Sequence, residues 1–340
     1  MTGIYTDPRC LDHAAPEHPE RPERVRAAVD ALRSVPGLRW PEVRPAEPAL
    51  VARVHEERLV RGIHQLAESG GGWIDADTFV VPASFDAALM AAGATLQAVA
   101  DVLGQREQNA FVPVRPPGHH ARHDRAMGFC LFNSIAVAAR WALDEGGARK
   151  VAILDVDVHH GNGTQDIFWE TPEVLYYSTH QFPFYPGTGR LSDVGGGEGA
   201  GATVNVPLVA GCGDATFLAV TDQVLVPMVR RFEPDVVLVS LGFDAHWADP
   251  LAQMELTTAG YTGILARINA LADELCGGRI VLLLEGGYDL GVIAEGSRTA
   301  VSVLNGEPGA CAPMDMQPPT NEPAGADDII ARACAIHDLT

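Results

Sequence analysis

Short, continuously hydrophobic runs alternate with longer amphipathic stretches along most of this chain of 340 residues. Continuous rather than alternating runs are typical of parallel strands that are buried on both faces of a sheet. The runs predict strands over residues 111–114, 151–155, 174–178, 236–240 and 280–284. The amphipathic stretches predict helices over residues 85–103, 132–143, 216–232 and 257–276. This alternation predicts a doubly wound α/β sheet, whose ligands bind at the carboxyl ends of the strands.

Residues that favour helix ends interrupt this pattern. Asp214 stands where a helix N-cap is expected, and Gly146 and Gly277 follow helices as C-cap glycines do. We expect a proline-rich surface segment over residues 307–323 and a last short helix over residues 327–338. The length is within the range of one large α/β domain, so we expect the whole chain to form a single domain.

The charge and the cysteine content narrow the class of protein. The chain has 24 basic and 44 acidic residues, a net charge of −20, which argues against a surface that binds nucleic-acid phosphates. The acidic excess fits either solubility or attraction of cationic substrates such as basic peptides or polyamines. Six cysteines without a CxxC spacing argue against a disulfide framework and favour a reducing, cytoplasmic location. No apolar run approaches the roughly 18–20 residues that span a bilayer, so we expect no membrane association.

Polar residues follow directly after the strand predicted over residues 151–155, in the segment DVDVHHGNG. Alternation along an extended chain puts Asp155, Asp157 and His159 on one side. Two carboxylates and an imidazole at the edge of a sheet are the ligands that a divalent cation needs. Helix capping is the alternative explanation for any one of them. So many buried carboxylates in one segment, however, require a compensating cation.

A second strand ends in a further candidate ligand. The strand predicted over residues 236–240 continues into LGFDAH, where Asp244 leaves the sheet at the same edge. Asp244 would complete a metal site of two aspartates and one histidine, although by itself it fits a helix N-cap as well. Three protein ligands leave room for water and substrate, which indicates a catalytic rather than a structural metal site.

The strands predicted over residues 111–114 and 280–284 end in segments that suit acid–base chemistry. RPPGHHA holds His119 and His120 on a turn that its prolines make rigid. Imidazoles near a metal-bound water are suited to carrying protons, because their pKa lies near working pH. EGGYD presents Tyr288, whose hydroxyl can donate to a developing oxyanion. By itself, a tyrosine after two glycines is also common in ordinary turns.

Taken together and in this order, the motifs resemble those of the zinc-dependent histone deacetylase superfamily. The resemblance is to its class II-like branch of bacterial deacetylases and acetylpolyamine amidohydrolases. The motifs are RPPGHHA, GFCLFNS, LDVDVHHGNGTQ, FYPGTG, LGFDAHWADPL and LEGGYDL. The motif-bearing core covers about residues 18–304, beginning at HPERPER. The resemblance implies the arginase–deacetylase fold, an α/β domain with a central parallel sheet of about eight strands flanked by helices.

The resemblance also implies roles for individual residues. The implied zinc ligands are Asp157, His159 and Asp244. The implied catalytic residues are His119, His120, Tyr288, Asp155, which orients the first histidine, and Asn162, which stands beside the second. A structural potassium ion is implied at Asp155, Asp157, His159 and Ser178. The implied substrate-binding residues are Gly128, the channel walls Phe129 and Tyr185, Leu251 and Asp77 at the rim, and Arg24 beneath the metal.

The activity that the resemblance implies is removal of acetyl, or other acyl, groups from lysine side chains by zinc-activated water. Other divalent ions suit the same oxygen-rich ligands. An acetylpolyamine amidohydrolase is the alternative: Leu251 stands where polyamine-selective relatives place a glutamate, whereas the net charge of −20 favours a polyamine. An inactive acyl-lysine-binding protein is a distant alternative, because this chain keeps every ligand and the tyrosine. The oligomeric state stays open, a homo-oligomer included.

Overall fold

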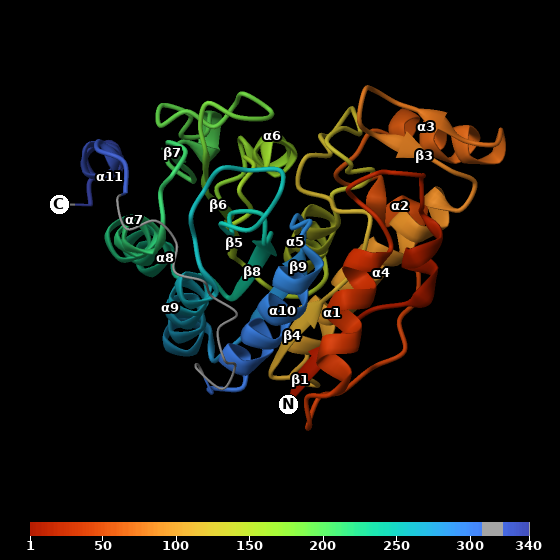
Figure 1. The fold of residues 1–340 in the computed structure, drawn as a ribbon, viewed down its shortest axis with the longest axis horizontal. Coiled ribbons are helices and arrows are strands. Elements are labelled where there is room, and N and C mark those ends of the chain that lie inside the picture. The colour runs from red at the N-terminus through yellow and green to blue at the C-terminus, as the bar shows by residue number, and fades with distance from the viewer. Residues whose placement is uncertain (308–321, 340) are drawn as a thin grey trace.

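The computed structural model describes residues 1–307 and 322–339, and Figure 1 shows how their elements are arranged. Seven strands of these residues form one parallel sheet, in the order β1-β4-β9-β8-β5-β6-β7. They are β1 (Thr2–Ile4), β4 (Asn109–Val112), β5 (Val151–Asp155), β6 (Val174–Gln181), β7 (Thr203–Leu208), β8 (Val236–Leu241) and β9 (Ile280–Leu284). A separate hairpin pairs β2 (Gly72–Trp73) with β3 (Phe79–Val80). The parallel sheet therefore has seven strands in the described residues, and not eight.

All the predicted strands are present. The sequence pattern missed the two hairpin strands, which have two residues each, and two strands of the parallel sheet, β1 and β7, which lie at its edges. β1 has only three residues, too few to form a recognisable run. β7 carries Asn205 and Pro207, which interrupt its apolar pattern. An edge strand tolerates both residues because only one of its sides is paired.

Helices cover both faces of the sheet, so that the protein has a hydrophobic core on each face. Ala152 and Leu154 of β5 belong to one core, and Val151 and Ile153 to the other, since successive side chains of a strand point to opposite faces. The helices of the first core are α1 (Glu23–Arg33), α7 (Asp214–Val220), α8 (Val226–Phe232), α9 (Thr258–Cys276), α10 (Leu290–Leu304) and α11 (Ala326–Ile336). Those of the second are α2 (Pro48–Val51), α3 (Glu57–Glu68), α4 (Ser84–Leu103), α5 (Ser134–Asp144) and α6 (Asn162–Phe168).

The helix α4 is the most apolar of the long helices. By length and composition alone it could cross a membrane, but 67% of that stretch is buried inside the protein. It packs against α5 and β4. A helix in a protein core needs the same composition as a membrane span, so burial accounts for the sequence of α4.

Two of the predicted helix ends differ in the structure. Asp214 is the first residue of α7 rather than its cap, and its carboxylate accepts hydrogen bonds from the backbone N–H and the hydroxyl of Thr257. Glu322, far along the chain, accepts from the first free N–H groups of α7 instead, those of Ala215 and Thr216. A cap that comes from a distant segment leaves no local sequence signal.

The C-cap prediction holds for one glycine and fails for the other. Gly277 ends α9 in the left-handed conformation, with φ of +63°. α5 ends at Asp144 with Glu145 as its cap residue, and Gly147 rather than Gly146 has a positive φ. The last helix, α11, is present at residues 326–336. Most of the segment predicted over residues 307–323 lies outside the described residues.

The strand order determines where the functional loops meet. β4, β9, β8 and β5 are consecutive neighbours in the sheet, although they are far apart in sequence. Their carboxyl ends lead into the loops that carry His119 and His120, Tyr288, Asp244, and Asp157 and His159, in that order. Because parallel strands end at the same edge, these four loops lie side by side.

Candidate metal centre and acid–base site

Three side chains that the sequence predicts as metal ligands converge at this edge of the sheet. The ligand atoms of Asp157, His159 and Asp244 all lie within 4.8 Å of one another. His159 Nδ1 is 3.1 Å from Asp157 Oδ1 and 3.1 Å from Asp244 Oδ2. Both carboxylates are fully buried. The chain thus brings together two anionic oxygens and one imidazole nitrogen from two neighbouring strands.

Backbone amides hold both carboxylates in place. Asp244 Oδ1 accepts from the N–H of Val158 at 3.0 Å, and Asp157 Oδ2 accepts from the N–H of Gly286 at 2.8 Å. Gly286 must be a glycine, because a Cβ built on it would lie 2.0 Å from Asp244 Oδ2. The carboxylates are therefore oriented by the loops themselves.

The donor chemistry of this centre fits a divalent cation. Burial and the nearby Asp157 carboxylate raise the pKa of Asp244. Burial acts on Asp157 in the same direction, but His119 and His159 outweigh it and lower the pKa of that carboxyl. Two buried carboxylates that interact this closely favour a positive charge between them. One imidazole and two carboxylates match a three-ligand catalytic site for zinc or a similar ion.

The two consecutive histidines have different partners. His119 Nδ1 lies 3.1 Å from Asp155 Oδ2, and His120 Nδ1 lies 2.8 Å from Asn162 Oδ1. The pKa of His119 rises to about 10, because Asp157 and Asp155 outweigh the opposing effect of burial. Burial, together with the positive charges of His119 and His159, lowers the pKa of His120 well below its usual value. A neutral His120 that donates Nδ1–H to the Asn162 oxygen has a free Nε2 lone pair.

Tyr288 is held from two sides. Asp249 Oδ2 accepts its backbone N–H at 2.7 Å, and the Arg24 guanidinium lies 4.9 Å from the centre of its ring. Burial raises the pKa of the Tyr288 hydroxyl well above its usual value, although Arg24 opposes this shift. The hydroxyl therefore keeps its proton and can serve as a hydrogen-bond donor.

A cavity of about 220 Å³ joins these residues to the protein surface. It is lined by Asp77, Pro117, His119, His120, Gly128, Phe129, His159, Tyr185, Leu251, Gly286 and Tyr288. Tyr185 packs edge-on against His120, with 5.1 Å between ring centres, and Phe129 packs edge-on against Tyr288 at 5.9 Å. Gly128 has φ of +57°, and a Cβ there would lie 2.6 Å from the His120 ring. The small residue therefore keeps this wall of the cavity open.

Most of the residues predicted to bind substrate lie on this cavity, but Arg24 does not. Arg24 is fully buried and ion-paired with Glu20 at 3.0 Å. Its guanidinium also donates to the carbonyl oxygens of Gly287, at 2.6 Å, and Glu285. In this structure Arg24 is therefore a buried support behind Tyr288 and not part of the cavity wall.

The residues predicted for a potassium site lie close to the metal ligands. Ser178 stands opposite Asp155 in the register of β6 and β5. Its hydroxyl lies 2.9 Å from His180 Nδ1. Asp155 Oδ1 accepts the backbone N–H of Asp157 at 3.3 Å, and Asp155 Oδ2 accepts the Tyr176 hydroxyl at 3.2 Å. The predicted set is thus clustered, and its ion stays a prediction.

Four buried charged residues that support the site were not singled out from the sequence: Glu20, Arg115, Asp249 and Glu285. Glu20 joins Arg115 at 2.5 Å as well as Arg24. Asp249 accepts the backbone N–H of Leu251, at the cavity wall, in addition to that of Tyr288. All four lie inside the motifs of this chain. Their signal was a charged residue inside a motif in which other members already had roles.

The parallel α/β sheet and the site at its edge together define a hydrolase of the deacetylase type. The sequence-family model "Histone deacetylase domain" matches residues 18–304 of the chain. The chain belongs to the histone deacetylase family.

Similar proteins come from plants and from an archaeon. The chain is 40% identical over 332 residues to "Histone deacetylase 10, chloroplastic" of Oryza sativa subsp. japonica, covering 92% of this chain and 75% of that protein. It is 42% identical over 297 residues to a "Probable deacetylase" of Archaeoglobus fulgidus, covering 85% and 82%. The crystal structure of the HDA15 HD domain superposes with a TM-score of 0.91 at 36% identity, over 99% of this chain and 94% of that one.

Proposed function

We propose that this member of the family is a metal-dependent amidohydrolase that removes acetyl, or other acyl, groups from lysine side chains. One observation carries the proposal: the Asp157–His159–Asp244 centre, the paired histidines and Tyr288 all lie around one narrow cavity. Amide hydrolysis needs an electrophilic centre, a base for water and a hydrogen-bond donor for the developing oxyanion. The metal centre, the paired histidines and Tyr288 would supply these three functions in that order.

Asp157, His159 and Asp244 would hold the metal ion. When bound, zinc or a similar divalent ion would polarise the acyl carbonyl and lower the pKa of a water molecule towards roughly 7. The two carboxylates are fixed by backbone N–H groups. His159 belongs both to the ligand set and to the cavity lining, so the cavity reaches the residues that would hold the metal.

The paired histidines carry the protons. His120 is the general base, because its neutral ring accepts a proton from water at Nε2 while Asn162 holds Nδ1. The oxygen of this water forms the new bond to the acyl carbon, and the amide C–N bond then breaks. The leaving amine takes its proton from the protonated His120 or from His119, which Asp155 keeps charged. The products are a carboxylic acid and a free amine.

Tyr288 stabilises the negative charge that develops on the acyl oxygen. Its hydroxyl stays protonated because burial raises its pKa. A single donor of this kind typically contributes about 3–4 kcal/mol of transition-state stabilisation. Asp249 and Arg24 hold Tyr288 from its backbone and from its ring face, which limits the reorganisation needed during reaction.

The walls of the cavity suit a neutral, acylated alkylamine arm. Phe129 and Tyr185 provide apolar surface for the methylene stem, each buried CH₂ contributing about 0.8 kcal/mol. This contribution is the same for lysine and for polyamines, so selection has to come from the mouth of the cavity. Leu251 offers no charge to a distal ammonium, whereas Asp77 can accept hydrogen bonds from a peptide backbone. The mouth thus favours acetyl-lysine, and acetylpolyamines are the second candidate substrates because the net charge is −20.

Two further parts of the proposal concern the surroundings of the enzyme. A structural potassium ion would be held beside Asp155 and Ser178, which are register partners on β5 and β6. A reducing, cytoplasmic location is supported by the cysteines of the described residues, which are all free.

An activity panel with a mouth variant tests the substrate assignment. Wild-type protein is assayed with acetyl-lysine peptides, acetylputrescine and acetylspermidine, and its metal content is measured on the same sample. In parallel, Leu251→Glu should raise the polyamine-to-lysine ratio of kcat/KM by roughly 5- to 150-fold, since a paired charge in a partly dry mouth contributes about 1–3 kcal/mol. Leu251→Gln is the matched uncharged control. Faster hydrolysis of acetylpolyamines than of any acetyl-lysine peptide by the wild type would make the lysine assignment wrong.

A further inference from the structure

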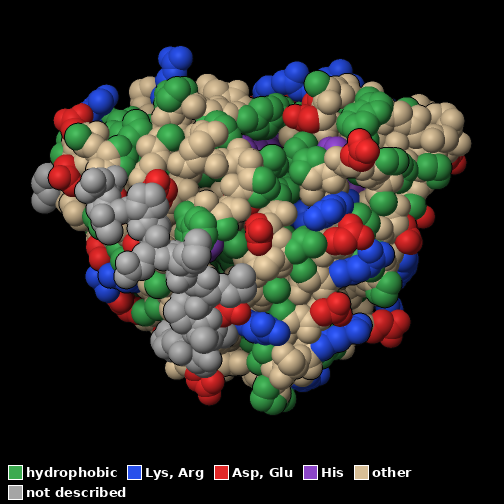
Figure 2. Space-filling view, viewed as in Figure 1, with side chains coloured by type: hydrophobic (Ala, Val, Ile, Leu, Met, Phe, Trp, Pro, Cys, Tyr) green, Lys and Arg blue, Asp and Glu red, His purple; other side chains and the backbone are tan. Residues whose placement is uncertain are grey.

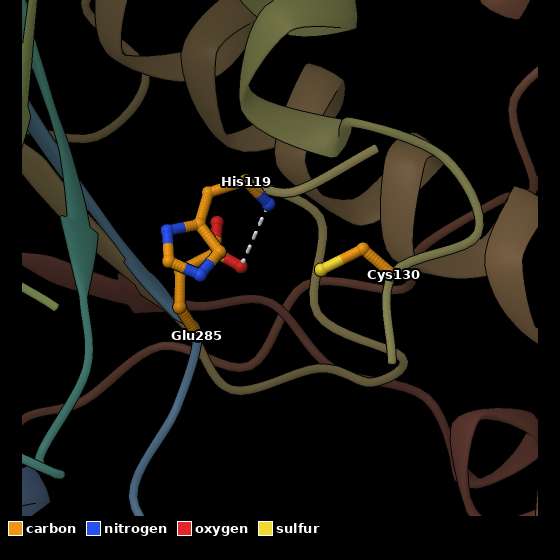
Figure 3. Close-up of side chains that lie close together, drawn as sticks. All are labelled: His119, Cys130 and Glu285. Carbon is orange, nitrogen blue, oxygen red and sulfur yellow. Dashed lines mark hydrogen bonds between the residues drawn. The ribbon is translucent and has the colours of Figure 1, made fainter. Parts of the chain in front are cut away.

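One of the paired histidines, His119, lies beside two buried residues that the reaction described above does not use, Cys130 and Glu285. His119, Cys130 and Glu285 have ligand-type atoms within 4.8 Å of one another, and Figure 3 shows their side chains close together. All three residues are buried, Cys130 and Glu285 completely. A carboxylate in such a place has to be hydrogen-bonded, and its partners indicate what it does.

Glu285 is bonded to the backbone of the histidine loop. Its Oε2 accepts the N–H of Gly118 at 2.7 Å and the N–H of His119 at 3.3 Å, the second of which is the dashed line in Figure 3. Its Oε1 accepts the hydroxyl of Ser240 at 3.1 Å. These bonds join two consecutive backbone amides and one side chain to a single carboxylate.

The same geometry argues against a second metal site in this cluster. Both oxygens of Glu285 are already used by the N–H groups and by Ser240. Burial raises the pKa of the Cys130 thiol well above its usual value, so it lacks the thiolate that a metal needs. Cys130 therefore packs beside the carboxylate as a small apolar side chain.

Glu285 and its partners belong to three different segments of the chain. Gly118 leads into His119 and His120 after β4, and Ser240 lies in β8, which leads to Asp244. Glu285 itself follows β9 and precedes Tyr288. One carboxylate thus joins the loop of the base, the strand of a metal ligand and the loop of the oxyanion donor.

The backbone of Glu285 is fixed independently of its side chain. Arg24 donates to the carbonyl oxygens of Glu285 and Gly287, and Glu20 pairs with Arg24 at 3.0 Å. Glu20 also pairs with Arg115, at the start of the histidine segment, at 2.5 Å. The carboxylate therefore projects from an anchored backbone and can transmit that position to the histidine loop.

We propose that Glu285 is a positioning residue, whose carboxylate sets the place of His119 and His120 relative to the metal ligands and Tyr288. The proposal rests on the proposed amide hydrolysis and deepens it. Glu285 takes no part in proton transfer to substrate, since it does not line the cavity. A displacement of about 1 Å in a catalytic group can lower the rate about 100-fold, so loss of this carboxylate should affect turnover rather than substrate binding.

Two substitutions test the role. Glu285→Ala should lower kcat by about 100-fold, with KM within about 2-fold of wild type and full metal content. Glu285→Gln keeps one carbonyl oxygen for the Gly118 N–H and should recover most of the loss, to within about 10-fold of wild type. In the background of His120→Ala, adding Glu285→Ala should change kcat by less than about 3-fold, because the residue acts through the histidine loop.

A second readout does not depend on activity. Hydrogen exchange of the amides in residues 114–121 should quicken in Glu285→Ala at unchanged metal content. Glu107→Gln is the matched control, because Glu107 is also a buried glutamate with an arginine partner, Arg39. Glu107 lies just before the amino end of β4, whereas the histidine loop follows its carboxyl end. The control variant should leave kcat and the exchange of residues 114–121 unchanged.

The outcomes separate this proposal from the proposed function. Unchanged kcat and exchange in Glu285→Ala, or a kcat loss that follows loss of metal, would overturn the positioning role while the hydrolase assignment stands. A wild-type protein inactive on every acylated amine, whose loop exchange still depends on Glu285, would overturn the hydrolase assignment and leave the structural link intact. A Gln variant as inactive as the Ala variant would also contradict the role, because it would show that the charge and not the hydrogen bond is needed.

Discussion

Two buried polar clusters lie close to the candidate site, and they balance their charges differently. The Glu20 cluster, formed by Glu20, Arg24, Arg115 and His13, contains opposite charges in direct contact. Arg24 and Arg115 complete their hydrogen bonds on backbone carbonyls. The metal-side cluster, formed by Asp155, Asp157, His159 and Asp244, contains three buried carboxylates. Among the described residues, the ion pairs that these carboxylates form within 4.0 Å are all with histidines.

This difference separates a structural charge network from a site built for an ion. A cluster in which opposite charges are in direct contact, and whose guanidinium groups also donate to backbone carbonyls, needs no ion from outside, and breaking it mainly costs stability. A cluster of carboxylates without an arginine or a lysine in contact needs a cation, and losing a ligand mainly costs binding and chemistry. Burial and hydrogen bonding are similar in the two clusters, so neither property alone distinguishes them.

The largest expected effect is the loss of a metal ligand. Asp244→Ala should lower both bound metal and kcat/KM by about 1000-fold or more, because it removes one of two anionic ligands. Metal analysis and a deacetylase assay on the same sample measure this. The control is Asp222→Ala, which removes an exposed carboxylate paired with Arg267. Full metal occupancy with near-normal turnover in Asp244→Ala would contradict the assignment of the metal-side cluster.

The next effect concerns the two histidines beside that cluster. His120→Ala should lower kcat by about 100-fold or more, since a positioned general base typically contributes at least about 100-fold. His119→Ala should lower kcat by only roughly 10-fold. The reason for the order is that the partner of His120 is a neutral amide, whereas His119 is bonded to a carboxylate. Metal content should be unchanged in both variants. The reverse order of rate losses would show that the roles are exchanged.

Removing the one carboxylate of the Glu20 cluster should affect stability more than metal binding. Glu20→Ala leaves two buried guanidinium groups without their counter-charge, which we expect to lower the free energy of unfolding by about 3–5 kcal/mol. Chemical denaturation of the metal-loaded protein measures it. The metal affinity of the folded variant should stay within about 3-fold of wild type, because its ligands lie on other loops. A large loss of metal affinity would mean that the two clusters are one coupled unit.

The smallest effect is a change in the pH dependence of stability. Burial lowers the pKa of His13 from 6.5 to about 3, so the folded protein keeps it neutral. Below pH 6.5 the unfolded chain binds this proton and the folded protein does not, so stability falls as pH drops, until about pH 3. The slope is at most about 1.4 kcal/mol per pH unit. His13→Asn should flatten the curve of unfolding free energy between pH 6.5 and 4, and an unchanged slope would rule out this source.

Glu20 adds to the same curve at lower pH. Burial would raise the pKa of its carboxyl, but Arg115 and Arg24 outweigh it and lower the pKa to about 2. The stabilisation is thus complete above pH 4.5 and is lost as pH falls towards 2. Measuring the unfolding free energy of Glu20→Gln and of wild type over this pH range isolates the contribution of Glu20. The curve of unfolding free energy against pH should be flatter in the variant.

The parts of the site that could be predicted from the sequence are those for which the residue type and its position after a strand are enough to suggest a role. Asp157 and His159 follow an apolar run directly, and a strand end is a local property of the sequence. Tyr288 follows β9 in the same way. The order of strands, by contrast, could not be derived from hydrophobic periodicity. It is decided by which side chains pack on each face, and it places β9 and β8 between β4 and β5.

The sequence by itself determined the fold class and the family, because both depend on short motifs in a fixed order. The same motifs predict the three metal ligands. Only the tertiary structure decided what the remaining buried charges do. An arginine at position 24 could either bind substrate or support the site from inside the protein. The structure shows that it lies against the ring of Tyr288 and does not line the cavity. Glu285 is joined to Gly118, 167 positions away, and Glu322 rather than Asp214 bonds the first amides of α7. A hydrogen bond between distant segments depends on how the chain packs, and no local pattern records it.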